Sequence, residues 1–494
     1  SDVLMQRATA LLARGANSDV SEDDTDELRQ RLIAGFRFIL VDEYQDINQA
    51  QCRFLSALAG RTLESEAEQL TMFAVGDDDQ NIYEWNGAEN RYIHQFATDY
   101  HARIEYMTEN YRSCAAVIQA SNRLIAQHPD RLKADYPIIA ANNAMGGSVR
   151  LYLGQVTALQ QKALELCLDM VGNEHVPPER IAILCPRHRD YQALASLLRS
   201  AGLPLCLINK KSPYRWERLR EVHTMLSVLD GHDTLTAGAI RTAWLAMPEP
   251  VHLHRSVMPL WDWLAGHDTS EDVVRPKQEW RSEIWELAKS ESKKTGQGIW
   301  LGTMHSVKGL EFERVIVFAG QQHTASTFCE DLRLRYVAMT RAEQHLVLMQ
   351  HEGNWFTHLG LETESLPLEV RESPLVTDVY ACGMDAVDMD FAGRLSHAVD
   401  TSMLHEQDQL EWHDNRGEFS WNGQVVGKLS RQTLSHLEQK KQQGWHIDAI
   451  KVQAIVRRQR SDISAEQYLA RCKQDEWHVI LPEIHLHQGY GRSL

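Results

Sequence analysis

Two carboxylates follow a short apolar run near the start of this 494-residue chain, and they could act together on a metal-bound phosphate. Asp42 and Glu43 come directly after residues 38–41, which read Phe-Ile-Leu-Val. An aspartate at the carboxyl end of a strand can hold Mg²⁺ through water, and a neighbouring glutamate can activate water for attack on phosphate. For this pair alone, the start of a solvated loop is an equally good interpretation.

A second polar run follows the next apolar stretch, at residues 72–75. Residues 76–85 read Gly-Asp-Asp-Asp-Gln-Asn-Ile-Tyr-Glu-Trp, and a parallel strand would bring them to the same sheet edge. Gln80 could sense a terminal phosphate or orient the attacking water. Tyr83 and Trp85 are flat aromatics on a polar segment, as base stacking requires. Plain core packing is the alternative for both rings.

Three further motifs complete the set. Residues 108–113 read Thr-Glu-Asn-Tyr-Arg-Ser, residues 302–312 read Gly-Thr-Met-His-Ser-Val-Lys-Gly-Leu-Glu-Phe, and residues 334–342 read Leu-Arg-Tyr-Val-Ala-Met-Thr-Arg-Ala. Taken singly, each is an ordinary polar loop in which an arginine or histidine is solvated. Five such motifs in this order, each beside an expected strand or helix, are hard to obtain by chance.

Together the five motifs resemble those of the UvrD/Rep-like superfamily-1 DNA helicases, over about residues 28–350. In that family two RecA-like lobes clamp ATP between them and move along single-stranded DNA. The resemblance implies ATP and Mg²⁺ as cofactors. It also implies single-stranded DNA, or a junction of single and double strands, as the partner, with movement from 3′ to 5′.

The resemblance also implies roles for individual residues. Arg112 and Arg341 would be arginine fingers, which stabilise charge on the transferring phosphoryl group. Tyr111 would stack on the adenine and Glu311 would contact the ribose. The full set comprises Asp42 for Mg²⁺, Glu43, Gln80, Arg112 and Arg341 for catalysis, Tyr111 and Glu311 for the nucleotide, and Tyr83, Trp85, Thr303 and His305 for DNA.

Three departures from the family pattern stand out. Asn86 replaces the arginine of the usual Trp-Arg-Gly, and Glu84 stands where a small or basic residue is usual. The phosphate-binding loop G-x-x-x-x-G-K-[ST] does not occur. We therefore expect a fragment that is inactive alone and whose partner is the missing N-terminal part of the same polypeptide. A natural relative that has lost catalysis, acting as a non-catalytic DNA- or partner-binding module, is the alternative.

These motifs require an α/β fold with RecA-like parallel-sheet lobes, the first of them incomplete. Short apolar runs predict strands at 38–41, 72–75, 149–153, 181–185, 205–208, 315–318 and 345–348, with helices between most of them. A helix of about 20 residues is expected between the first two strands. The predicted domains are a partial first lobe at 1–109, a second lobe at 110–230 and 298–370, a reduced helical insertion at 231–297 without strands, and an α+β module at 385–494.

The two ends of the chain have features of their own. Residues 1–37 read as helical, and the acidic stretch 21–27 suits the first turn of a helix. In the tail, Asn422-Gly423 predicts a hairpin, followed by a helix at 430–442 and a strand at 478–481. The tail resembles the end of bacterial RecQ-type polypeptides fused to a UvrD-like motor.

Composition excludes several classes of protein. An apolar fraction of 43% and a charged fraction of 24% are those of an ordinary globular protein. The eight cysteines form no C-x-x-C pair, which favours reduced thiols and a cytoplasmic location over a zinc or iron–sulfur site. No apolar run reaches the length of about 18–20 residues that a membrane helix needs. A net charge of −17 argues against wrapping DNA by charge alone, but is compatible with stacking in a groove.

Overall fold

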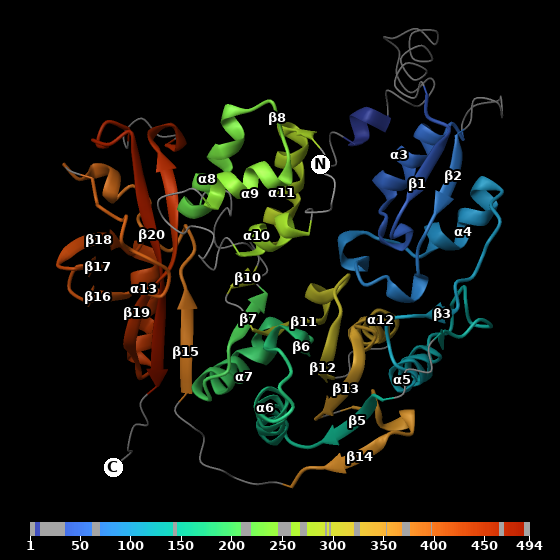
Figure 1. Ribbon diagram of the computed structural model, residues 1–494. Helices are drawn as coiled ribbons and strands as arrows, with labels where there is room; N and C mark the ends of the chain where they lie inside the picture. Colours follow the sequence, from blue (N-terminus) through green and yellow to red (C-terminus); the bar gives the residue numbers. More distant parts are fainter. Residues whose placement is uncertain are drawn as a thin grey trace. The chain divides into compact units, whose positions relative to one another are not determined.

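The computed structural model of the chain divides into two compact units, each described here by itself (Figure 1). The first comprises residues 1–176, 180–188 and 302–369, and the second comprises residues 177–179, 189–301 and 370–494. The structure describes residues 5–9, 35–61, 70–141, 146–208, 219–245, 258–266, 274–291, 294–295, 298–320, 327–351, 353–367, 376–396, 398–463 and 469–488. Most of the helix predicted over residues 1–37 lies outside these ranges.

The first unit contains the predicted β–α–β arrangement. Strands β1 (Phe38–Val41) and β2 (Thr71–Ala74) pair in parallel, and α3 (Gln49–Ala59) lies between them in the chain. The helix has 11 residues, fewer than expected, because signals at both ends limit it. The Asn48 side chain accepts the Gln51 backbone N–H at 3.0 Å as an N-cap, and Gly60 ends the helix with φ 77°.

One face of the β1–β2 pair is apolar and open to solvent. Leu40 is 73% exposed and Phe73 is 57% exposed, whereas the opposite face packs against Tyr44 and Phe96. Parallel strands are normally covered on both faces. This small sheet therefore presents a face of the kind that another layer of structure usually covers.

A larger parallel sheet completes the first unit. The order is β6 (Ile181–Cys185), β12 (Phe312–Phe318), β13 (Ala342–Gln350), β5 (Ser148–Leu153) and β14 (Glu362–Ser365), with parallel neighbours throughout. Helix α5 (Ala115–Ile125) contacts β5 and β13, and α12 (Phe328–Met339) contacts β12, β13 and α5. Other elements of this unit are α4 (Arg91–Tyr100), β3 (Glu109–Asn110), β4 (Ile139–Ala140) and α6 (Val156–Gly172).

The second unit begins with α7 (His188–Ser200) and the parallel strands β7 (Leu205–Ile208) and β11 (Ile299–Thr303). A short antiparallel strand, β10 (Lys294–Thr295), pairs with β7. With β7 and β11, the parallel core of the described chain has seven strands, which confirms the mixed α/β class. The strands predicted from apolar runs are all present, with shifts of one to three residues at some ends.

The insertion is mainly helical, as expected. It contains α9 (Ala237–Leu245), α10 (Met258–Ala265) and α11 (Lys277–Glu291), which bury Trp244 and Trp280, and α8 (Arg220–Ser227) precedes it. The expectation of no strands was wrong, because β8 (Thr234–Leu235) pairs with β9 (Arg275–Pro276) and β10 also lies within residues 231–297. A two-residue pairing needs no apolar run and leaves no periodic signal.

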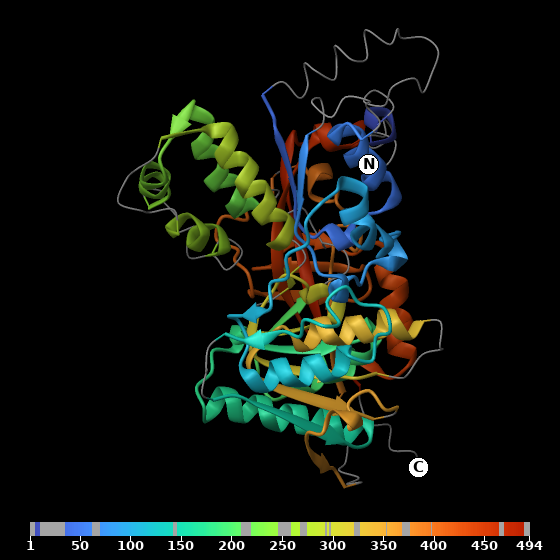
Figure 2. The same cartoon turned by 90° about the vertical axis from the view of Figure 1, so that its right-hand side faces the viewer.

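The tail forms an antiparallel sheet in the order β15 (Val376–Ala381), β20 (Glu476–Gln488), β19 (Trp445–Gln459), β16 (Gln409–His413), β17 (Glu418–Trp421) and β18 (Gln424–Lys428). Figure 2 shows it from a second side, with the long strands β19 and β20. Asn422 and Gly423 take φ values of 49° and 76° in the predicted hairpin, and α13 (Arg431–Gln442) follows it. Among the described residues, no helix has the length and apolar character needed to span a bilayer.

The exposed sheet face gives a first prediction. Phe73→Ser should reduce self-association and change the free energy of unfolding by no more than about 0.5 kcal/mol, because Phe73 contributes little to the core. The matched control is Phe356→Ser at a fully buried phenylalanine, which should cost about 3 kcal/mol or more. Sedimentation and denaturant unfolding measure the two effects. Equal destabilisation by both variants would contradict the description of this face as open.

Candidate functional site

The first pair of candidate residues lies where β1 ends. Glu43 adopts a left-handed backbone conformation, with φ 51°, which turns the chain sharply into the short helix η1 (Tyr44–Asp46). The Tyr44 backbone N–H donates to the Val75 carbonyl at 2.9 Å and fixes this turn beside the end of β2. The carboxylates of Asp42 and Glu43 are thereby presented at the carboxyl edge of the two strands.

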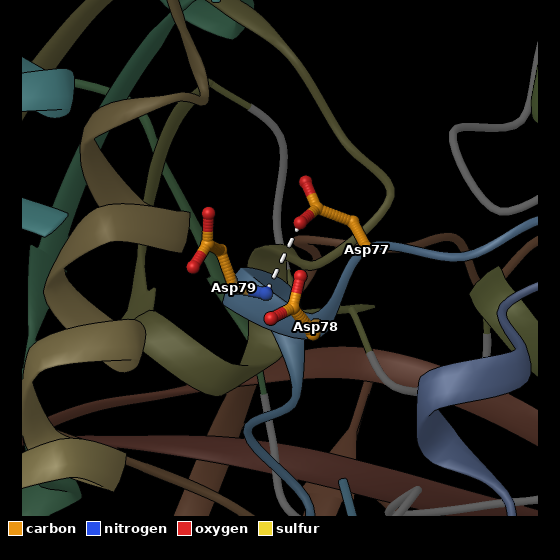
Figure 3. A group of neighbouring side chains, drawn as sticks. All are labelled: Asp77, Asp78 and Asp79. Carbon is orange, nitrogen blue, oxygen red and sulfur yellow. Dashed lines mark hydrogen bonds between the residues drawn. The ribbon is translucent and has the colours of Figure 1, made fainter. Parts of the chain in front are cut away.

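Three consecutive aspartates follow β2, and their carboxylate oxygens lie within 4.8 Å of one another (Figure 3). Basic side chains already contact two of them. Arg131 donates to both oxygens of Asp79, at 2.8 and 2.6 Å, and Lys133 Nζ lies 2.6 Å from Asp77 Oδ1. The Asp79 backbone N–H donates to the same Asp77 oxygen at 3.1 Å. The two basic side chains therefore balance most of the negative charge of the three aspartates.

The middle aspartate is also held by the protein. Burial raises the pKa of the Asp78 carboxyl, and the Leu132 backbone N–H, which donates to Asp78 Oδ2 at 2.8 Å, opposes that rise. The triplet therefore joins η3 (Asp78–Gln80) to residues 131–133, and this structural role accounts for all three carboxylates.

Gln80 and Arg341 meet although 261 positions separate them in the chain. Arg341 Nη2 lies 3.5 Å from Gln80 Oε1, and its Nε donates to the Val337 carbonyl at 3.0 Å. Burial, together with the positive charge of Arg112, lowers the pKa of Arg341 to about 10, so the guanidinium stays charged at neutral pH. Two predicted catalytic residues are thus in reach of each other.

Lys308 was not predicted to be a site residue, although it lies within the motif at residues 302–312. This buried ammonium donates to Asp46 and to the Gln80 carbonyl, the latter at 3.1 Å, and lies 3.5 Å from Glu43 Oε2. It also lies 5.2 Å from the ring centroid of Tyr83. Burial raises the pKa of Asp46, whereas Lys308 opposes that rise. A lysine between His305 and Glu311 was the available signal.

Arg112, the predicted arginine finger, and Glu311, the predicted ribose contact, form an ion pair. Arg112 Nε lies 2.5 Å from Glu311 Oε2, and both side chains are partly open to solvent. Tyr111 is largely exposed, and its hydroxyl donates to Glu109 at 2.6 Å. The structure therefore brings Arg112 and Glu311 together and leaves the Tyr111 ring free to stack.

The predicted DNA contacts differ in exposure. Trp85 is 68% exposed, and its ring centroid lies 6.1 Å from that of the half-buried Tyr83. Thr303 ends β11, and its carbonyl accepts the Ser306 hydroxyl at 2.6 Å. Burial lowers the pKa of His305, so this imidazole is neutral at pH 7 and could meet a phosphate only as a neutral donor. The exposure of Trp85 argues against the core-packing alternative for this residue.

Two stretches of the chain match known helicase domains. Residues 2–101 match the UvrD/REP helicase N-terminal domain, and residues 281–353 match the UvrD-like helicase C-terminal domain. These two stretches are therefore similar to UvrD/Rep-type helicase domains, as the motifs predict.

Three relatives illustrate the similarity. DNA helicase II from Haemophilus influenzae is 42% identical over 103 residues, covering 21% of this chain and 13% of the relative. ATP-dependent DNA helicase UvrD2 from Mycobacterium tuberculosis is 24% identical over 336 residues, covering 63% and 47%. ATP-dependent DNA helicase Rep from Salmonella typhimurium is 33% identical over 129 residues, covering 24% and 18%. The chain spans less than half the length of each.

The Lys308 contacts give a second prediction. Lys308→Met should lower the free energy of unfolding by about 3 kcal/mol, because Asp46 would be left without a cation in a mostly buried site. Adding Asp46→Asn should recover part of that loss, since no unpaired carboxylate then remains.

The matched control is Lys162→Met on α6, where the partner Glu165 is exposed and the pair should contribute less than about 0.5 kcal/mol. Denaturant unfolding of these three variants and of the unsubstituted chain provides the comparison. A double variant less stable than Lys308→Met would contradict the pairing.

Proposed function

We propose that this chain is part of an ATP-dependent DNA helicase or translocase that acts on single-stranded DNA, moving from 3′ to 5′. The observation that carries the proposal is the convergence of distant motifs: Glu43 and Gln80 from the early motifs meet Lys308 and Arg341 from the late ones. In such a motor, nucleotide binding between two lobes requires this kind of meeting. The exposed Trp85, a few residues from Gln80, supports single-stranded DNA as the partner.

ATP with Mg²⁺ is the proposed cofactor. The donor set fits it in part, since two carboxylates, a glutamine and two arginines suit a metal-bound phosphate and its transferring group. Asp42 would hold Mg²⁺, Glu43 would take a proton from the attacking water, and Arg112 and Arg341 would face the phosphates. ATP hydrolysis would supply the energy for movement. Arg112 and Glu311 now pair with each other, so nucleotide binding would exchange that ion pair for contacts to the phosphate and ribose.

The remaining part of the phosphate cradle is proposed to come from an N-terminal part of the same polypeptide. A pocket of about 1300 Å³ lies along β2 and is lined by the end of α4 and by residues 101–108. The adjoining face, with Leu40 and Phe73, is apolar and exposed. Both features support a first lobe that further strands would complete.

A non-catalytic module is the second candidate function. The absence of a G-x-x-x-x-G-K-[ST] run in these 494 residues favours it, and the exposed Trp85 would serve it equally well. Under either proposal the protein would work in the cytoplasm, and the tail would be the module related to RecQ-type polypeptides. The two candidates differ in whether the complete polypeptide supplies a phosphate-binding loop, because only the helicase needs one.

The stacking proposal predicts a specific loss of DNA affinity. Trp85→Ala should weaken binding of a fluorescent oligothymidylate by about 1–3 kcal/mol, the usual contribution of one stacked base. The matched control is Trp285→Ala on α11, a tryptophan that is 49% exposed, which should leave the affinity unchanged. Fluorescence anisotropy titration measures both. Equal affinities for the unsubstituted chain and Trp85→Ala would remove Trp85 from the proposed DNA site.

Both candidate functions predict slow ATP turnover by this chain alone. This chain alone should release phosphate from ATP no faster than its Glu43→Gln variant, with or without oligothymidylate, because the sequence contains no phosphate-binding loop. A phosphate-release assay on the two proteins makes the comparison. DNA-stimulated turnover that disappears in Glu43→Gln would contradict the expected inactivity and would support catalysis by these residues.

A further inference from the structure

Helix α12 and the turn that follows it contact the polar segment at residues 80–85 at two separate places. Arg341, two residues beyond the end of the helix, approaches Gln80, and Arg333, in the first half of the helix, approaches Asn81 and Glu84. One short stretch of the chain therefore contacts both the phosphate-sensing candidate and the base of the loop that carries Trp85.

Arg333 is almost fully buried, at 3% exposed, and every part of its guanidinium has an acceptor. Nε donates to the Asn81 carbonyl at 2.7 Å, Nη1 faces His128 Nε2 at 2.8 Å, and Nη2 donates to the Glu84 carboxylate. Burial and the neighbouring Arg333 lower the pKa of His128, so this imidazole is neutral and can accept. The fork geometry of arginine thus fixes the backbone and the side chain of the same loop.

The next residue of this loop, Trp85, belongs to η4 (Glu84–Asn86), a single turn in which the described residues provide no side-chain cap. The contacts of Arg333 to Asn81 and Glu84 therefore hold the start of this turn, and they leave the indole ring itself exposed.

The Glu84–Arg333 pair also explains an unusual feature of the sequence. A free carboxylate beside a DNA-stacking ring would repel the phosphate backbone. Arg333 neutralises that carboxylate and uses it as an anchor. Simple core packing would need neither the charge on Glu84 nor the exposed ring of Trp85 next to it.

We propose that Arg333 is a positioning residue for single-stranded DNA: it holds the loop of residues 83–87 so that Trp85 is placed to stack on a base. This inference rests on the proposed function, because it assumes that Trp85 contacts DNA. It goes further by assigning the alignment of the DNA-binding ring to the same helix that leads to Arg341.

A double-mutant cycle tests the proposal with the full chain and a fluorescent oligothymidylate. Arg333→Gln, which removes the charge, and Arg333→Lys, which keeps the charge but loses the fork, should each weaken binding about 3- to 10-fold. In a Trp85→Ala background the same substitutions should change affinity less than about twofold, because the ring that they position is gone. The control Glu165→Ala, on α6, should have no effect in either background. Equal losses in both backgrounds would overturn the proposal, since they would indicate general destabilisation.

Hydrogen exchange provides a readout that does not depend on DNA. Both substitutions should accelerate amide exchange in a peptide covering residues 83–87 while leaving β6 protected. Unchanged exchange in this peptide would overturn the proposal. If Arg333→Gln does not fold, Arg333→Lys alone decides. If the unsubstituted chain binds no oligothymidylate, the proposed function fails, and faster exchange would still establish the contacts that hold the loop.

Discussion

Buried cations around residues 77–84 are the interaction on which the rest of the candidate site depends. A buried charge costs free energy unless partners of good geometry satisfy it. Here each cation contacts a carboxylate or carbonyl oxygen of this segment or of the turn at residues 43–46. These contacts offset the free-energy cost of burying the charges. The cations come from later parts of the chain, and they are Arg131, Lys133, Lys308, Arg333 and Arg341.

These ion pairs lie between the proposed nucleotide site and the proposed DNA site. Gln80 faces Arg341 on one side of the segment, and Trp85 leaves it on the other. Arg341 follows the C-terminal end of α12, and α12 holds the Trp85 loop through Arg333. Lys308 is a second residue that contacts both sites, because it lies near Glu43 of the proposed catalytic set and near Tyr83 of the proposed DNA contacts. The two proposed sites therefore share one short segment of the chain, residues 80–85.

Local sequence patterns predicted the framework well, and long-range pairing less well. The apolar run at 181–185 predicted a buried strand because a strand covered on both faces needs no polar position. The turn at Asn422-Gly423 was predictable because two positive φ angles favour these residues. The partners of Glu84 and Asp79 were not predictable, since ion pairs between distant segments leave no periodic trace. The departure at Glu84 appeared in the sequence only as an anomaly, and Arg333 explains it.

The central claim is that single-stranded DNA binds at the loop that α12 holds. Photo-crosslinking of the full chain to an oligonucleotide containing 5-iododeoxyuridine, followed by mass spectrometry of the digested protein, tests it most directly. The account predicts a main crosslinked peptide that contains Tyr83 and Trp85 and that disappears in competition with unlabelled oligothymidylate. Crosslinks confined to the tail at residues 376–488, or none that unlabelled DNA competes away, would contradict it.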